Sequence, residues 1–270
     1  MSSTLDNHSS AKIVRLLNIG ESGTAKTGQL ASLALAGYNL YILDYDNGLD
    51  ILANVLRHKD PEALKRVHYE TIRDKIIKRG KGYEIKSPPT AFARAGDVLT
   101  EWKADEFTAK DIIVLDTLNT FSSAGFNAAT FAAGRLNQKP QQSDYGWMAD
   151  RVLLFLEGLT SDDMNCNLVV NTHIRYFDSD DETGMQARGL PAAKGRQIPQ
   201  NISKYFNTVI HSRTIGSGAG TKRIISTQPQ GVIEVKTSNP IGVKPQYGVE
   251  NGLAELFKDI LGSTPSSPTK

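Results

Sequence analysis

The chain has 270 residues, of which 39% are hydrophobic and 22% are charged, and its formal net charge is +2. This composition is typical of a globular protein with a full core, and the near-neutral charge means that any nucleic-acid binding must depend on local patches. The single Cys166 excludes an internal disulfide and a cysteine metal cluster, and no apolar run in the sequence is long enough to span a membrane. We therefore expect a soluble cytoplasmic protein with no membrane partner.

The elements alternate along the chain between short apolar runs and helical patterns. Polar segments at 1–10 and 263–270 predict disordered tails around one domain, 11–262. The apolar runs have the β-branched and leucine content of parallel strands buried on both faces, and they lie at 13–19, 38–43, 112–115 and 167–170. The helical patterns between them lie at 27–36, 90–104 and 147–159. This order predicts an α/β fold with a mostly parallel twisted sheet, flanked by helices, and a ligand at the carboxyl ends of the strands.

The first apolar run leads into a near-match to the phosphate-binding loop. Glycines let main-chain N–H groups surround phosphate, Lys26 reaches the outer phosphates, and the Thr27 hydroxyl can bind Mg²⁺. Ala25 stands where the pattern has glycine, and its methyl group is tolerable if φ stays negative. We expect ATP and Mg²⁺ as cofactors, with the nucleotide held by Gly20, Glu21, Ser22, Gly23, Thr24, Ala25, Lys26 and Thr27.

The other three apolar runs end in polar residues suited to nucleotide hydrolysis. The run 38–43 is followed by Asp44 and Asp46, which share one side of a continuing strand, so either carboxylate can approach the attacking water. Asp116 directly follows the run 112–115 and is placed to hold Mg²⁺ through its water shell. His173 lies just beyond the run 167–170, where it can sense the γ-phosphate.

Two regions fall outside this pattern. Residues 55–88 are hard to assign, because their basic run at 73–81 fits either an exposed helix face or an insertion. After residue 200, short alternating runs at 206–213, 221–227 and 231–236 predict a C-terminal antiparallel extension of the sheet. The glycine-rich segment 216–220 is the predicted hairpin turn between the first two of these runs.

These motifs together resemble the RecA superfamily, and more narrowly the phage-borne RecA-core ATPases that include single-strand annealing proteins. The resemblance covers 12–245 and implies a RecA-like P-loop core in the cytoplasm of a host cell. It also implies catalytic roles for four residues, namely Asp46 as the water-activating acid, Lys26 on the phosphates, His173 as the sensor and Lys236 acting on the ATP of a neighbouring subunit. Thr27 and Asp116 would hold the metal.

The chain departs from the family pattern at three positions. RecA has a glutamate where this chain has Asp46, and recombinases commonly have a glutamine where it has His173. Ser238 replaces the second cation of the pair that acts across the subunit interface, which implies either slow hydrolysis or a substitute such as Arg223.

The resemblance further implies two DNA-facing loops, at about 122–146 and 176–198. Cations there would neutralise phosphates, and aromatic rings would stack on bases. Acidic residues at 178, 180, 181 and 182 leave ordinary surface loops as the alternative. The predicted DNA contacts are Arg135, Lys139, Tyr145, Arg175, Arg188, Lys194 and Arg196, with Trp147 nearby.

Three functions fit this sequence. The first is an ATP-dependent, single-stranded-DNA-binding recombination or annealing protein that assembles as a filament or ring and works with a single-stranded-DNA-binding protein. The second is a hexameric helicase or helicase loader, although 270 residues show no accessory helicase or primase domain. The third is a nucleotide-switched binding module with negligible turnover, which the departures at Ala25 and Ser238 favour.

Overall fold

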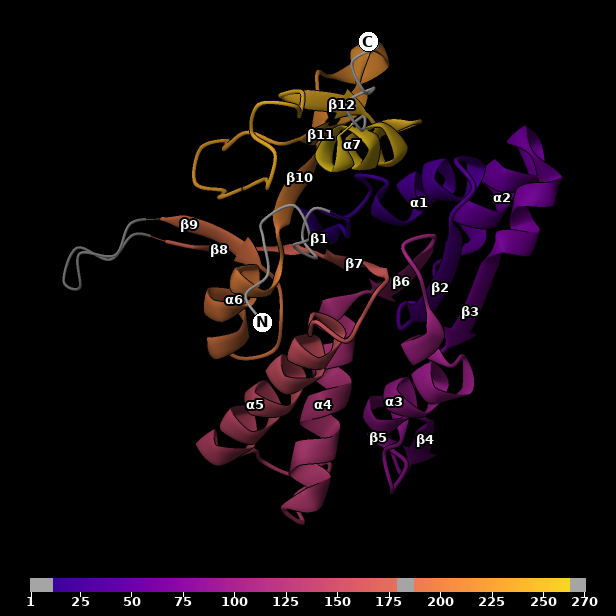
Figure 1. Cartoon of the computed structure of the whole chain (residues 1–270). Coiled ribbons are helices and arrows are strands. Elements are labelled where there is room, and N and C mark those ends of the chain that lie inside the picture. The colour runs from indigo at the N-terminus through magenta and orange to yellow at the C-terminus, as the bar shows by residue number, and fades with distance from the viewer. Residues whose placement is uncertain (1–11, 179–186, 263–270) are drawn as a thin grey trace, which may run out of the picture.

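The computed structural model describes residues 12–178 and 187–262, so both predicted tails and residues 179–186 of the second predicted DNA-facing loop lie outside the described residues. Its centre is an eight-stranded sheet with the strand order β12-β11-β10-β1-β7-β6-β2-β3 (Figure 1). The strands are β1 Arg15–Gly20, β2 Asn39–Asp44, β3 Val67–Thr71, β6 Asp111–Asp116, β7 Asn167–Thr172, β10 Thr208–Ile215, β11 Lys222–Ser226 and β12 Gln246–Gly248.

Strands β10, β1, β7, β6, β2 and β3 are parallel, whereas β11 pairs antiparallel with both β10 and β12. The central strands β6 and β7 are buried along their whole length, as expected for strands covered on both faces. The fold class predicted from the sequence is therefore confirmed, including the four core strands and the antiparallel C-terminal extension.

Helices cover both faces of the sheet, and each face has its own hydrophobic core (Figure 1). One layer contains α1 Lys26–Leu35, α2 Asp50–Lys59 and α7 Gly252–Leu261. The other contains α3 Ala91–Glu101, α4 Leu118–Ala132, α5 Gln142–Leu159 and the short α6 Gln197–Asn201. Short 3₁₀-helices lie at Pro61–Arg66, Ala104–Glu106, Ile202–Tyr205 and Gly218–Gly220. No helix within 12–178 or 187–262 combines the length and hydrophobicity that a membrane crossing requires.

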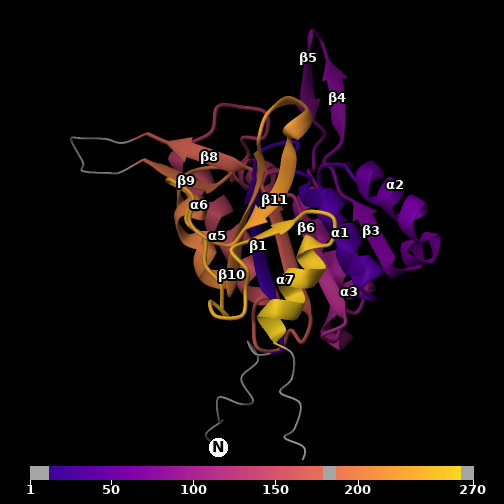
Figure 2. The same cartoon turned by 90° about the horizontal axis from the view of Figure 1, so that it is seen from above.

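Two small hairpins extend from the carboxyl edge of the sheet. The first, β4 Ile76–Arg79 with β5 Gly82–Ile85, is inserted between β3 and α3 and projects from the body of the protein (Figure 2). It accounts for the basic run at 73–81, for which the sequence left a helix face or an insertion open. The second hairpin, β8 Ile174–Phe177 with β9 Arg188–Pro191, continues directly from β7.

Two predictions about local structure are wrong. The segment 231–236 is not a strand, because Gln230 and Ile233 exchange main-chain hydrogen bonds and close a turn, and β12 takes the outer place in the sheet instead. The predicted loop 122–146 is mostly helical, since α4 runs to Ala132 and α5 begins at Gln142. Gly125 allows this packing, because a Cβ there would come within 3.2 Å of the Phe92 and Val152 side chains.

Candidate functional site

The segment Gly20–Thr27 forms a tight loop between β1 and α1, with α1 beginning at Lys26. Gly20 lies so close to β10 that a Cβ there would meet the Ser212 carbonyl oxygen at 2.4 Å. Gly23 has φ 78° and Ala25 has φ 67°, both in the left-handed region. The condition under which a methyl group is tolerable at Ala25, a negative φ, is therefore not met. Its methyl group costs about 1–2 kcal/mol in this conformation, which glycine would adopt without strain.

Lys26 and Thr27 join the loop to its surroundings. Lys26 Nζ donates to the main-chain oxygens of Gly20 and Glu21, both at 2.8 Å, and burial lowers the pKa of its amine against the opposing charges of Asp116, Asp46 and Glu21. Thr27 Oγ1 donates to Asp116 Oδ2 at 2.6 Å. The loop and the end of β6 are thus in direct contact, as the sequence prediction requires.

Asp116 is 2% exposed and ends strand β6. Burial raises the pKa of its carboxyl to about 6, and the nearby charges of Asp46 and Asp44 add to this rise, whereas hydrogen bonds from Thr27 and Asn171 oppose it. A hydroxyl and a carboxylate that meet at the start of a helix form the oxygen donor set that Mg²⁺ prefers beside phosphates. The residues present therefore fit the predicted Mg²⁺ site.

The structure distinguishes Asp44, the last residue of β2, from Asp46, two residues beyond it. Asp44 is buried and caps the following turn, with Oδ1 accepting from the Asn47 N–H at 2.8 Å and Oδ2 from Thr71 Oγ1 at 3.1 Å. Asp46 instead faces the phosphate loop, where its carboxylate accepts from Thr120 Oγ1 at 2.5 Å and Thr117 Oγ1 at 3.1 Å. Only Asp46 is therefore placed to act on a water beside the loop.

A cavity of about 370 Å³ lies between the phosphate loop and the strand ends, and predicted site residues at the ends of three strands line it. His173, directly after β7, lines it, and burial together with the charge of Lys26 lowers the pKa of the imidazole, so that the ring is neutral at pH 7. Asp46, Asp116 and Lys26 complete the same cavity. The pattern of polar residues at strand ends therefore identified groups that the fold brings together.

The structure adds Arg223 of β11 to the cavity, and its Nε donates to the Gly23 carbonyl oxygen at 2.7 Å. Sequence reasoning named this residue only as a substitute for a missing cation, because its approach depends on the pairing of β11 with β10. Lys236 is exposed and pairs through its main chain with Val209, and it does not line this cavity. Its predicted action on a neighbouring subunit remains a prediction.

A buried chain of polar side chains crosses the sheet next to this cavity, and sequence reasoning missed it. It connects Asp116 to Asn171, Asn18, Ser212 and Gln29. Asn171 Nδ2 donates to Asp116 Oδ1 at 3.3 Å, and Asn18 Nδ2 donates to Asn171 Oδ1 at 3.0 Å. Asn18 between Leu17 and Ile19 in the first run was the available signal, because a buried amide in a central strand needs partners on adjacent strands.

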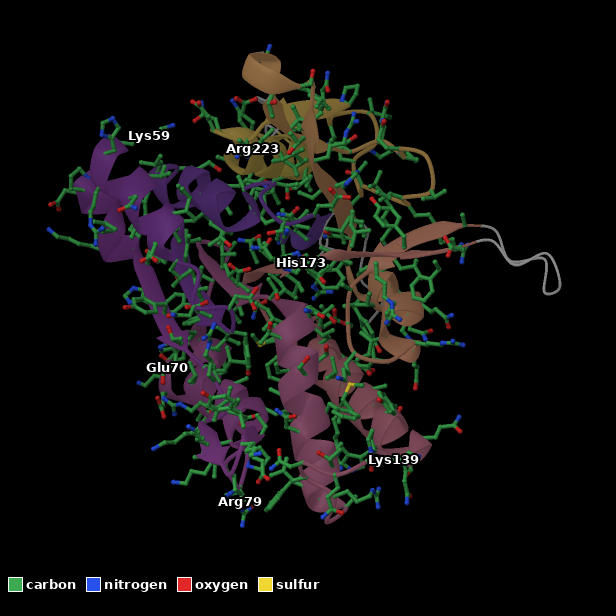
Figure 3. The ribbon with its side chains drawn as sticks, turned by 180° about the vertical axis from the view of Figure 1, so that it is seen from behind. Lys59, Glu70, Arg79, Lys139, His173 and Arg223 are labelled. Carbon is green, nitrogen blue, oxygen red and sulfur yellow. The ribbon has the colours of Figure 1, made fainter. Side chains whose placement is uncertain are left out.

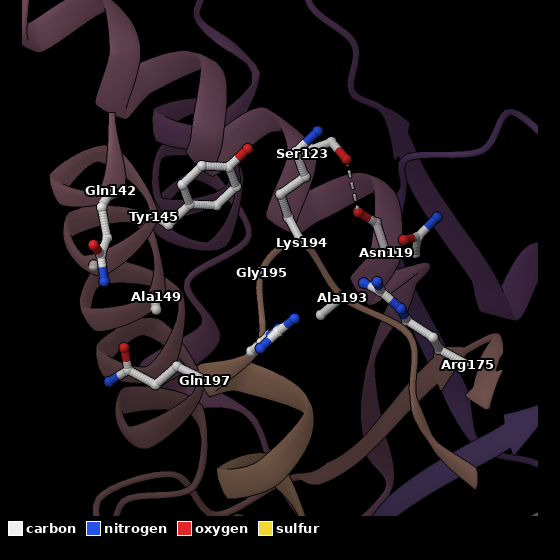
Figure 4. A pocket seen from close by; sticks show the side chains of 12 residues that line it. Asn119, Ser123, Gln142, Tyr145, Ala149, Arg175, Ala193, Lys194, Gly195 and Gln197 are labelled. Carbon is white, nitrogen blue, oxygen red and sulfur yellow. Dashed lines mark hydrogen bonds between the residues drawn. The ribbon is translucent and has the colours of Figure 1, made fainter. Parts of the chain in front are cut away.

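A second cavity, of about 780 Å³, opens beside α4, α5 and the segment 193–197 (Figure 4). Tyr145, Arg175, Lys194 and Arg196 line it, and among residues 12–178 and 187–262 no carboxylate does. Lys194 Nζ lies 4.8 Å from the centre of the Phe126 ring, and the Lys194 N–H donates to Ser122 Oγ at 2.9 Å, so this segment is fixed against α4. The fold therefore brings together four of the seven predicted DNA contacts.

The other three predicted DNA contacts lie elsewhere. Arg135 pairs with the buried Asp144 and thereby joins α5 to the turn before it. Arg188 pairs with Glu234 at 3.1 Å. Lys139 is at the far end of the α4–α5 pair, away from His173 (Figure 3). The structure thus separates these three cations from the cavity that contains the others.

No protein-family model and no curated protein matches this sequence. Among solved structures, the chain is similar to an ATPase from the type III secretion system of pathogenic bacteria, with 12% identity and a TM-score of 0.45 over 74% of this chain and 52% of that one. It is also similar to a KaiC-like protein from Pyrococcus horikoshii, with 12% identity and a TM-score of 0.41 over 79% of this chain and 78% of that one. The chain therefore spans about half the length of the secretion ATPase.

Proposed function

We propose that this protein hydrolyses ATP at the phosphate loop and uses the nucleotide state to control its grip on single-stranded DNA, as a recombination or annealing protein. The observation that carries the proposal is the contact between Thr27 Oγ1 and Asp116 Oδ2, in the same cavity as Lys26 and Asp46. A phosphate-binding loop, a metal-binding carboxylate and a candidate base together are the parts that phosphoryl transfer to water requires.

The residues divide the work as follows. Loop N–H groups and Lys26 bind the phosphates, and Asp46 orients the attacking water and accepts its proton. Thr27 and Asp116 would hold Mg²⁺, which supplies charge neutralisation at the phosphates. Neutral His173 would form a hydrogen bond with the outer phosphate. When hydrolysis removes that phosphate, the loss of this bond would shift β8, which begins one residue later.

DNA binding rests on the cavity beside α5. Arg175 lies two residues beyond His173 on β8, and Lys194 and Arg196 lie just after β9, which pairs with β8. A change at His173 therefore has a short covalent and hydrogen-bonded path to all three cations. Tyr145 offers an aromatic face in the same cavity, as sequence-tolerant binding of single strands requires.

The proposed assembly is a filament or ring, with Lys236 acting on the ATP of a neighbouring subunit. Its exposure outside the cavity of its own chain is compatible with that role. A single-stranded-DNA-binding protein is the proposed partner in the cell.

One observation favours a second function, a nucleotide-switched binding module with very slow turnover. The Asp46 carboxylate already accepts hydrogen bonds from Thr117 and Thr120, so both of its oxygens are engaged before a water arrives, and Ala25 is strained. Turnover of Mg·ATP indistinguishable from that of Lys26→Ala would support the switch.

The test is steady-state ATP hydrolysis with and without oligo-dT, at low salt, for wild type, Lys26→Ala and Arg196→Ala. We expect DNA to stimulate the wild type, Lys26→Ala to be inactive, and Arg196→Ala to retain basal turnover but lose most of the stimulation. A strand-annealing assay then separates the recombination function from a helicase motor. If oligo-dT neither binds nor changes turnover, the DNA-dependent function is refuted.

A further inference from the structure

The proposed function gives no role to the β4–β5 hairpin, which extends from the carboxyl edge of the sheet. Residues 73–86 contain six cations and two carboxylates, whereas the whole chain has a net charge of only +2. One of the carboxylates, Asp74, is engaged with the N–H groups of Thr90 and Ala91 and with Asn127. The exposed part of the hairpin is therefore strongly positive.

The hairpin is held firmly in place despite its projection from the body. Asp74 fixes its base to α3 and α4 through hydrogen bonds of 2.8–2.9 Å. On the other strand of the same end, where Ile85 is opposite Ile76, the Asn137 side chain forms two hydrogen bonds with the main chain of Ile85, both at 2.9 Å, and so ties β5 to the turn after α4. A ligand binding here would meet a preformed surface.

Between the hairpin and the end of α4 lies a groove of about 800 Å³. Lys78, Arg79 and Lys86 line it together with the half-exposed ring of Phe131. Glu84 also lines the groove and pairs with Arg79 at 3.1 Å, so Lys78 and Lys86 carry its net positive charge. Lys78 and Tyr83 are directly opposite each other on the two strands, and Tyr83 is 76% exposed. A lysine next to an exposed aromatic ring pairs a phosphate contact with a stacking surface for a base.

This groove lies along the same edge as the two cavities of the proposed site. A hollow of about 280 Å³ lies between them. It shares Ile85 with the groove and Asp46 with the phosphate-loop cavity, and it shares Ser123 with the cavity that contains Arg175, Lys194 and Arg196, here called the cation cavity. Arg73, at the base of the hairpin, donates from Nη2 to the main-chain oxygen of Asp46 at 2.5 Å. The hairpin is thus structurally connected to the candidate catalytic base.

We propose that the β4–β5 hairpin and its groove are a second binding surface for single-stranded nucleic acid, which contacts the part of a strand that extends beyond the cation cavity. This inference rests on the proposed function, because the same strand occupies both surfaces. Positive charge with exposed aromatic rings, rather than a broad apolar face, favours a polyanionic strand over a protein partner.

The test measures binding of dye-labelled oligo-dT by fluorescence anisotropy. Single-strand-binding domains cover roughly 4–16 nucleotides, so a short strand of about 8 nucleotides should occupy one surface and a long strand of about 30 should reach both. Lys78→Ala and Tyr83→Ala should each weaken binding of the long strand about tenfold and leave the short strand unaffected. Lys78→Ala should also reduce the salt slope by about 0.7. Tyr83→Phe should restore binding, because it keeps the ring.

Two controls separate this inference from the proposed function. Lys110→Ala removes an exposed cation at the opposite edge of the sheet and should leave binding of both oligonucleotides unchanged. Arg196→Ala should weaken binding of both the short and the long oligonucleotide. If Arg196→Ala weakens binding but both hairpin variants bind the long strand as wild type does, the inference is refuted and the proposed function stands. If the wild type binds neither strand, both are refuted. A hairpin variant that alters only the oligomer mass would also refute the inference.

Discussion

The buried chain of polar side chains predicts a specific energetic coupling between Asn171 and Asn18. Asn171→Leu removes a donor to Asp116 and leaves the Asn18 Nδ2 group without its acceptor, at positions that are 0% exposed. An orphaned buried polar group costs about 1–3 kcal/mol, and a lost hydrogen bond to a charged group costs a similar amount. Since the bond to Asp116 is long, at 3.3 Å, we expect about 3 kcal/mol in total.

Asn18→Leu should cost a similar amount, because it orphans Asn171 Oδ1 and the Ser212 hydroxyl. In the double variant the bond between the two asparagines is removed from both sides, so neither leaves the other unpaired. The double variant should therefore be more stable than the sum of the single effects by about 1–3 kcal/mol.

The assay is thermal and urea unfolding of the four proteins without nucleotide. Each single variant should lower Tm by about 6–12 °C, at roughly 2–4 °C per kcal/mol for a chain of this size. Effects that add to within about 0.5 kcal/mol would show that the two amides do not share a buried bond, and would refute this account of the sheet.

Three further predictions concern the phosphate-loop cavity. Ala25→Gly should raise Tm by about 2–4 °C in thermal unfolding, because glycine removes the cost of φ 67° but adds about 0.4–1 kcal/mol of unfolded-chain entropy, which leaves a net gain of about 1 kcal/mol. The pKa of Asp116 is about 6 in the folded protein against an ordinary 3.8, so the stability that its protonated form gives is present below pH 4 and is lost as pH rises through 6. The Asp116→Asn side chain cannot ionise. Its unfolding free energy, measured without metal, should therefore exceed that of the wild type by an amount that grows from near zero at pH 4 to about 3 kcal/mol at pH 7. The same variant should lose Mg²⁺-dependent turnover. Arg223→Ala should lower kcat/KM for ATP about tenfold, through its lost contact near the phosphates, whereas the adjacent Lys222→Ala should not.

The phosphate-loop side of the site could be predicted because its signals are local. The strand, loop and helix from residue 13 to 36 are consecutive, and the carboxyl ends of neighbouring parallel strands meet at one edge of a sheet. That Asp46 and Asp116 lie in one cavity could therefore be predicted without any knowledge of side-chain packing. The choice between Asp44 and Asp46 was not available in this way, because it depends on the turn that Asp44 caps.

The DNA-facing side could not be predicted to the same extent. The expected loop at 122–146 came from a family resemblance, whereas Phe121, Ala124 and Ala129 place apolar side chains on one face of a helix and bury it. Arg135 looked free in the sequence, but its partner Asp144 is brought near only when α5 begins at Gln142. A cation that completes a helix–turn contact cannot be distinguished from a free one by composition alone.

Arg73 connects the β4–β5 hairpin to the main chain of Asp46 and thereby couples the hairpin to the phosphate-loop cavity. Its guanidinium binds the main chain of Asp46, while the next residue, Asp74, anchors the hairpin to α3 and α4. Any displacement of the hairpin by a bound strand must therefore act on the backbone that positions the candidate base. Arg73→Ala should leave nucleotide affinity and long-strand binding near their wild-type values, yet uncouple turnover from the hairpin, so that Tyr83→Ala no longer changes the DNA stimulation of ATP hydrolysis. Stimulation in Arg73→Ala that remains as sensitive to Tyr83→Ala as in the wild type would show that the strand acts on the catalytic cavity by another route.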